Sequence, residues 1–199
     1  MKTDVIVISS RGNQIEAVLD QVEKVSAYKE LSSKNALHLR LLAEEMMGMM
    51  RSLTGETEGE FWIEDEKAVY QLHLKVQTIM DPDKREQLLA ASTSGKNESA
   101  KGLMGRLRDF FDRGTDGGYV SSLVLPSMYE HSTTPLLDWE WSMLEYQKEL
   151  SIQVETNESG AKEAWDELEK SVVAHVADDV KVSIRGRDVE MIIYKEMKD

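Results

Sequence analysis

The sequence has no cysteine, no long apolar run and no excess of basic residues. Without cysteine, disulfides, thiolate metal sites and cysteine nucleophiles are excluded. No segment reaches the roughly 18–20 apolar residues of a membrane span, and the apolar run at residues 5–8 is too short for a signal peptide. The 24 basic and 37 acidic residues give a net charge of -13, which repels nucleic-acid phosphates. We therefore expect a cytoplasmic protein that binds neither nucleic acid nor membrane.

The overall composition is typical of a folded protein. The chain has 199 residues, of which 41% are hydrophobic, enough for one domain, or one domain with an insertion, and for a normal core. Segments of β-branched or alternating residues predict strands at 4–8, 59–64, 69–79, 120–125, 180–184 and 189–194. The turns of two hairpins are predicted at residues 65–67 and 185–187.

Longer amphipathic segments predict helices at 13–31, 36–55, 84–91, 103–111, 136–150 and 161–176. Ser32 and Ser33 are suited to cap the second of these helices. The order of strands and helices predicts an α+β fold. We expect a two-layer sandwich, in which helices cover one face of a mostly antiparallel mixed sheet, with an insert before the last hairpin.

The predicted helix at 36–55 carries two adjacent acidic residues in its middle. Its apolar side chains recur at three- and four-residue spacing and so share one face: Leu39, Leu42, Met46, Met49, Met50 and Leu53. Glu44 and Glu45 lie about 100° apart around the helix axis. Two interpretations stay open: one acid points to the edge of a pocket, or both lie on the solvated face beside Arg40 and Arg51.

Five short motifs follow one another along the chain. Residues 43–49 read AEEMMGM, and Asp81 opens the sequence DPDKR after the first predicted hairpin. Residues 92–96, STSGK, and 102–105, GLMG, form a polar loop that runs into a helix start. Gly186 and Arg187 stand in the closing hairpin. Over residues 4–111 and 178–195 this order resembles the Bergerat-fold (GHKL) ATP-binding domain of the histidine-kinase-like ATPases, most closely its anti-sigma-factor serine-kinase branch.

The resemblance implies a domain organisation and a set of site residues. Residues 1–111 and 178–199 would form the ATP-binding domain, and residues 112–177 a partly helical insert. Glu44 takes the position of the family's general base, which accepts a proton from the attacking hydroxyl. Asp81 takes the position of an adenine contact, its alternative being an ordinary Asp-Pro turn. The implied phosphate lid consists of Lys96, Lys101, Gly102 and Gly105, its alternative being an ordinary flexible loop.

The loop at residues 92–101 is predicted to be mobile without ligand. It has no large apolar side chain whose burial would offset the entropy of ordering it. We expect it to become ordered only when phosphates bind at the helix start near Gly102.

The departures from the family's motifs concern the metal above all. Where the family has a Mg²⁺-binding asparagine, this chain has Gly48, which has no side-chain oxygen. Asp83 and Arg85 stand where glycines would let the backbone approach the nucleotide, and Arg187 replaces the closing threonine. The implied cofactor is ATP or ADP, whereas Gly48 argues against Mg²⁺. The four histidines show no ligand spacing, so no metal ligand is assigned.

Three functions of different classes stay open. The first is a regulatory protein that resembles the anti-sigma factors of transcription regulation, binds a protein partner such as a sigma-like factor, and has weakened or lost nucleotide binding. The second is an active ATP-dependent serine protein kinase, which needs Glu45 or Asp83 as a substitute magnesium ligand. The third is a homodimerisation module that associates through the insert. The insert's Trp139, Trp141 and Tyr146 either anchor a partner or pack its own core.

Overall fold

The computed structural model describes residues 1–9, 15–54, 58–77, 138–157, 160–185 and 188–198. Several predictions concern residues outside these ranges: the helices at 84–91 and 103–111, the strand at 120–125 and the loop at 92–101. The same holds for five predicted site residues, namely Asp81, Lys96, Lys101, Gly102 and Gly105.

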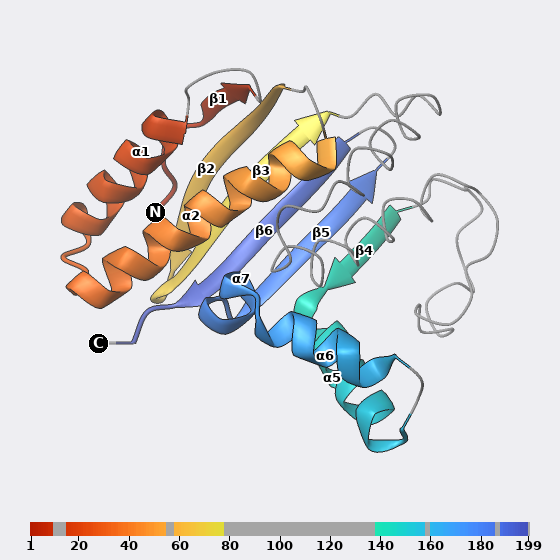
Figure 1. The fold of residues 1–199 in the computed structure, drawn as a ribbon. Helices are drawn as coiled ribbons and strands as arrows, with labels where there is room; N and C mark the ends of the chain where they lie inside the picture. Colours follow the sequence, from red (N-terminus) through yellow and green to blue (C-terminus); the bar gives the residue numbers. More distant parts are fainter. Residues whose placement is uncertain (10–14, 55–57, 78–137, 158–159, 186–187, 199) are drawn as a thin grey trace.

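Six strands form one sheet in the order β1-β2-β3-β6-β5-β4 (Figure 1). Their bounds are β1 (Ile6–Ser9), β2 (Glu58–Glu66), β3 (Val69–Gln77), β4 (Asp138–Ser142), β5 (Asp179–Arg185) and β6 (Asp188–Glu196). Every pairing between these strands is antiparallel, so the described sheet is not mixed. The first and the last hairpin lie side by side, because β3 pairs with β6. The predicted α+β class, with two layers, is confirmed.

Two long helices, α1 (Ile15–Tyr28) and α2 (Ser33–Thr54), cover one face of the sheet (Figure 1). Ser32 caps α2 as predicted, since its Oγ accepts a hydrogen bond from the backbone N–H of Asn35 at 3.3 Å. Three shorter helices follow β4: α5 (Met143–Glu155), α6 (Ala161–Glu169) and α7 (Val172–Val176). α7 contacts α2, and α5 contacts β4 and β5. None of the helices in the described residues is long and apolar enough to cross a membrane.

The hydrophobic core lies between the helices and the sheet. The predicted apolar face of α2 is confirmed where side chains are described: Leu39, Leu42, Met46 and Met49 are buried. They pack in one cluster with Val18, Val22 and Val25 of α1, with Phe61, Ile63, Leu72, Leu74 and Ile193 of the sheet, and with Met143, Leu150, Leu168 and Val173 of α5–α7. Each fully buried side chain of this size contributes about 1.5–3 kcal/mol.

Two helix predictions in the second half of the chain are wrong in their bounds. Residues 138–142, predicted as the start of a helix, form β4, and their alternation of polar and aromatic residues, DWEWS, has the period of a strand. The helix predicted at 161–176 is two helices, because Ser171 interrupts it and caps α7 by accepting a hydrogen bond from the N–H of Ala174 at 3.3 Å.

The turn of the first hairpin also differs from its prediction. Asp65 pairs with Tyr70 and Glu66 pairs with Val69, so the turn consists of Lys67 and Ala68 rather than residues 65–67. Both turn residues have positive φ, at 49° and 68°. A two-residue hairpin loop with positive φ at both positions is the type I′ turn, which matches the twist of the strands it joins.

Candidate functional site

Glu44 lies on the surface of α2, where it takes part in a chain of ion pairs. Its Oε1 lies 3.1 Å from Nε of Arg40, one turn earlier on the helix. The guanidinium of Arg40 also pairs with Glu23 of α1. Glu44 remains 38% exposed, and Glu45 beside it is exposed. The contact with Arg40 is the one expected if the acids lie on the solvated face of the helix.

Gly48 follows one turn after Glu44 and is exposed. A Cβ atom placed on Gly48 would meet nothing within 4 Å. Because residues four apart lie on the same side of a helix, a side chain at position 48 would stand beside Glu44. The surface of α2 therefore has room for a side chain at position 48.

Two aromatic residues of the predicted insert, Trp141 and Tyr146, pack against the protein's own core. The rings of Trp141 and Tyr146 are tilted at 39° with their centroids 6.2 Å apart, and both side chains contact the core cluster. These two residues therefore pack against the core that the whole fold shares. The side chain of Trp139 is outside the described part.

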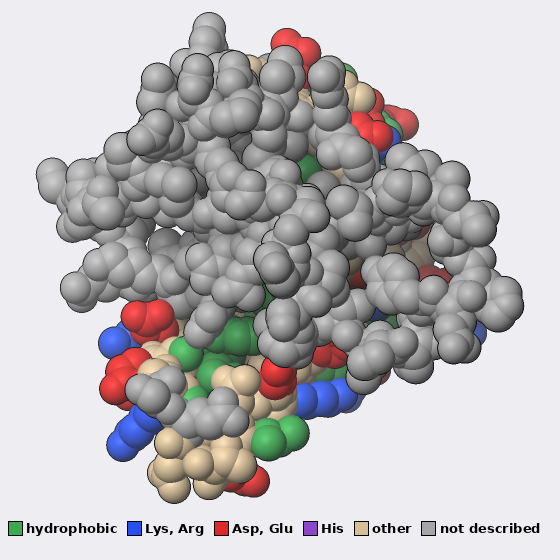
Figure 2. All heavy atoms as spheres, turned by 90° about the vertical axis from the view of Figure 1, so that its right-hand side faces the viewer, with side chains coloured by type: hydrophobic (Ala, Val, Ile, Leu, Met, Phe, Trp, Pro, Cys, Tyr) green, Lys and Arg blue, Asp and Glu red, His purple; other side chains and the backbone are tan. Residues whose placement is uncertain are grey.

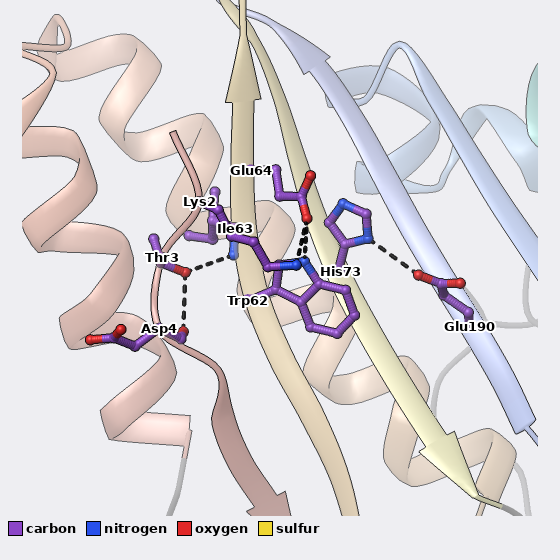
Figure 3. A network of polar contacts seen from close by, with 8 residues as sticks. All are labelled: Lys2, Thr3, Asp4, Trp62, Ile63, Glu64, His73 and Glu190. Carbon is purple, nitrogen blue, oxygen red and sulfur yellow. Dashed lines mark hydrogen bonds and ion pairs between the residues drawn. The ribbon is translucent and has the colours of Figure 1, made fainter.

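The opposite face of the sheet carries an aromatic and charged cluster that the sequence did not predict. Trp62 of β2 and His73 of β3 are direct cross-strand partners. Their rings stack with centroids 4.7 Å apart and an angle of 11° between the planes (Figure 3). The ammonium group of Lys2 lies 4.9 Å from the centroid of the Trp62 ring, within the range of a cation–π interaction. The described helices leave this face uncovered, yet both rings are buried, at 9% and 7% exposure.

Glu64 connects the members of this cluster. Its Oε1 accepts a hydrogen bond from the Trp62 indole Nε1–H at 2.8 Å and lies 3.0 Å from Nζ of Lys2. The hydrogen bond from Lys2, followed by that from Trp62, lowers the pKa of Glu64 below its usual value, and the nearby His73 adds a smaller effect in the same direction. Lys2 therefore tethers the N-terminal segment to β2 through Glu64 and the Trp62 ring.

Charged side chains continue across this face of the sheet. Lys181 of β5 lies 3.9 Å from Glu140 of β4 and 5.7 Å from the ring centroid of Tyr194 in β6. Burial, with a smaller contribution from nearby acids, raises the pKa of Tyr194. The face thus combines stacked rings at β2–β3 with paired charges at β4–β6.

The region of α5 and α6 has a mixed surface. In Figure 2, hydrophobic side chains lie among acidic and basic ones on the lower part of the molecule, where Figure 1 places these helices. Leu144 and Ile152 of α5 are exposed. No patch of a single charge gathers on the part of this surface that the structure describes.

The chain matches no protein-family model, no curated protein and no solved structure. Among the residues that the structure describes, no group of three or more histidine, aspartate and glutamate side chains could hold a metal ion.

Proposed function

We propose that this chain is a cytoplasmic regulatory protein with a Bergerat-like fold that resembles anti-sigma factors. It binds a protein partner, and its capacity to bind ATP or ADP with Mg²⁺ is weakened or lost. Two features of the structure support this proposal.

The first support is the order of the elements. A strand, two helices and a hairpin come first, and after β4 and α5–α7 a closing hairpin pairs with the first one. Helices cover one face of the resulting sheet. This order is consistent with the resemblance, most of whose motifs lie outside the described residues. In the proposal, α2 corresponds to the helix that carries the family's glutamate and asparagine.

The second support, which carries the proposal, is the surface of α2 around Gly48. Glu44 is retained, but its carboxylate pairs with Arg40. Gly48 contributes no oxygen beside it, although a side chain would fit there. Phosphoryl transfer depends on a divalent ion that neutralises the charge of the phosphates, so the loss of this oxygen weakens metal-dependent chemistry while the fold is kept.

The test is to restore the missing ligand with Gly48→Asn. We expect calorimetry to show that ATP binding to the unaltered protein is weak or undetectable and does not respond to Mg²⁺. In Gly48→Asn, Mg²⁺ should strengthen ATP binding by about tenfold or more, as one added charge-assisted contact would. Gly48→Ala is the matched control, because it fills the same space and has the same helical context without an oxygen. Micromolar, Mg²⁺-dependent ATP binding by the unaltered protein would overturn the proposal.

The alternative is an active serine protein kinase, and the exposed Glu45 next to Glu44 is the feature that favours it. A kinase should transfer labelled phosphate from Mg-ATP to a protein in a cell extract, and Glu44→Ala should abolish the transfer. Absence of transfer at millimolar Mg-ATP rules this alternative out. Sedimentation addresses the third function, since a protein that remains a monomer at all concentrations is not a dimerisation module.

A further inference from the structure

His73 is a buried histidine with one ring nitrogen engaged and one unengaged. Its Nδ1 lies 3.4 Å from Oε1 of Glu190 in β6. Its Nε2 is buried and has no hydrogen-bond partner in the described structure. The stacked ring of Trp62 holds the imidazole in place. In Figure 3 the unengaged nitrogen lies on the side of the ring toward Glu64.

The partners of His73 define which nitrogen carries the proton. An ionised carboxylate only accepts hydrogen bonds, so Nδ1–H must donate to Glu190 when the ring is neutral. Nε2 is then a bare lone pair in a buried position. A buried polar atom without a partner destabilises the folded state. In neutral His73, therefore, the acceptor Nε2 lacks a hydrogen bond.

Protonation of Nε2 by solvent changes this balance in two opposite ways. The imidazolium gains an ion pair with Glu190 and a cation–π contact with the Trp62 ring. It also turns Nε2 into an N–H donor that has no hydrogen-bond acceptor. The titratable and charged groups that alternate onto the same face come from β2 to β6 and the N-terminal segment: Glu58, Glu60, Glu64, Glu66, Lys75, Glu140, Lys181, Asp188, Glu190, Tyr194, Glu196 and Lys2.

Among these groups Glu64 is the acceptor that protonated His73 can recruit. Glu190 is already bonded to Nδ1. Glu60 stands opposite Lys75, on the other side of Trp62 from Glu64, whereas Nε2 lies on the side of the ring toward Glu64 (Figure 3). The other acids lie farther along the strands from His73, and the lysines and the tyrosine hydroxyl cannot neutralise an imidazolium. Glu64 is now held by Lys2 and by the indole of Trp62. If its carboxylate moves to Nε2–H, both of these partners lose it.

We propose that His73 is a pH-sensitive element that controls whether the side chain of Lys2 is bound to β2. When Nε2 takes up a proton from solvent, Glu64 leaves the Trp62 indole and Lys2 for the imidazolium. The Lys2 side chain is then released, while Met1 and Thr3 stay bonded to Asp65 and Ile63. Histidine is the side chain suited to this role, since its charge changes near neutral pH. The device is independent of nucleotide binding at α2.

The test is an NMR titration of the full chain from about pH 8 to pH 5, across the range in which histidine gains its proton. It follows the ring nitrogens of His73 and the indole N–H of Trp62, which Trp62→Phe assigns. We expect the indole resonance to shift with the same midpoint as His73. Its hydrogen exchange, corrected for the intrinsic effect of pH, should become about tenfold faster as the bond to Glu64 is lost. Contacts between the Lys2 side chain and the Trp62 ring should weaken in the same step.

Two substitutions complete the experiment. His73→Gln keeps a polar side chain that cannot gain a proton, so the indole shift should disappear. His175→Gln removes an exposed histidine of α7 and should leave the shift unchanged. The proposal is overturned if the indole of the unaltered protein does not respond while His73 titrates, or if His73 stays neutral until the protein unfolds. Should His73→Gln fail to fold, these measurements on the unaltered chain decide the matter.

Discussion

Lys29 and Asp65 form an ion pair that joins the end of α1 to the end of β2, with Nζ 2.7 Å from Oδ2. The amino group of Met1 lies 3.3 Å from the other carboxylate oxygen. Burial alone would raise the pKa of Asp65, but the hydrogen bond from Lys29 and the positive charges around the carboxylate outweigh burial and lower it. The same hydrogen bond raises the pKa of Lys29.

The lowered pKa of Asp65 predicts a loss of stability in acid. A carboxylate whose pKa is lower in the folded than in the unfolded chain stabilises the fold above the unfolded value of about 3.9, and this contribution is lost as the pH falls through the folded value. Asp65→Asn should therefore be less stable at pH 7 and should show a flatter decline in acid. Urea denaturation at a series of pH values measures both. Glu66→Gln removes an exposed acid from the same strand and is the control, and an identical flattening in that variant would refute the role of Asp65.

The hairpin of β2 and β3 illustrates how far the sequence could predict the fold. Alternation of apolar and polar residues located both strands, and the helical spacing of Leu39, Leu42 and Met46 gave the buried face of α2. These patterns suffice because they record which side of an element meets the core. The turn could not be located, because neither Lys67 nor Ala68 is a residue that favours positive φ.

The wrong position of the predicted turn also explains why the Trp62–His73 stack was not predicted. A turn at residues 67 and 68 places Trp62 opposite His73, whereas a three-residue turn at 65–67 would have placed it opposite Tyr70. The position and length of the turn fix which residues of the two strands pair. An error in the turn therefore makes every predicted cross-strand pair of the hairpin wrong. The ion pair between Arg40 and Glu44 was within reach of the sequence, since residues four apart on a helix are neighbours. The pairing of Arg40 with Glu23 of α1 could not be predicted in this way, because it depends on how the two helices pack against each other.

Replacing the unusual turn residues is expected to stabilise the protein. Lys67 and Ala68 adopt a left-handed conformation, which is unfavourable for residues with a Cβ atom. Ala68→Gly should raise the free energy of unfolding by about 0.5–1 kcal/mol, after the entropy cost of glycine. Ala27→Gly is the contrasting control, because Ala27 is exposed in α1 and glycine in a helix costs about 1 kcal/mol. Loss of stability in both variants would show that the turn is not strained.

Asp179 organises the junction between β4 and α5, and its removal should be costly. Its Oδ1 accepts hydrogen bonds from the hydroxyl of Ser142 at 3.0 Å, the N–H of Leu144 at 3.0 Å and the N–H of Val180 at 2.8 Å. Ser142 in turn caps α5. We expect Asp179→Ala to lower the free energy of unfolding by about 2 kcal/mol, and Ser142→Ala by about 1 kcal/mol.

Chemical denaturation of the two cap variants checks these values. Ser151→Ala is a suitable control, because the Ser151 hydroxyl donates only to the carbonyl of Lys148 within α5. A hydroxyl that bonds back to the helix contributes little to its stability, so this change should stay within about 0.5 kcal/mol. An effect of Asp179→Ala as small as that of the control would mean that the junction does not depend on the carboxylate.

Substitutions at Met46 and Gly48 should have opposite effects, because α2 turns one toward the core and the other outward. Met46 is completely buried, and Met46→Ala is expected to cost about 2–5 kcal/mol. Gly48 is exposed in the helix interior, where a Cβ meets nothing within 4 Å, so Gly48→Ala should stabilise the protein by about 1 kcal/mol. Urea denaturation measures the free energy of unfolding of both variants, and changes of opposite sign are expected from the orientation of α2. If Gly48→Ala were destabilising, Gly48 would face neighbouring atoms rather than open space. The surface beside Glu44 could then not accept a new ligand, and failure of Gly48→Asn to bind Mg²⁺ would reflect crowding rather than the absence of a nucleotide site.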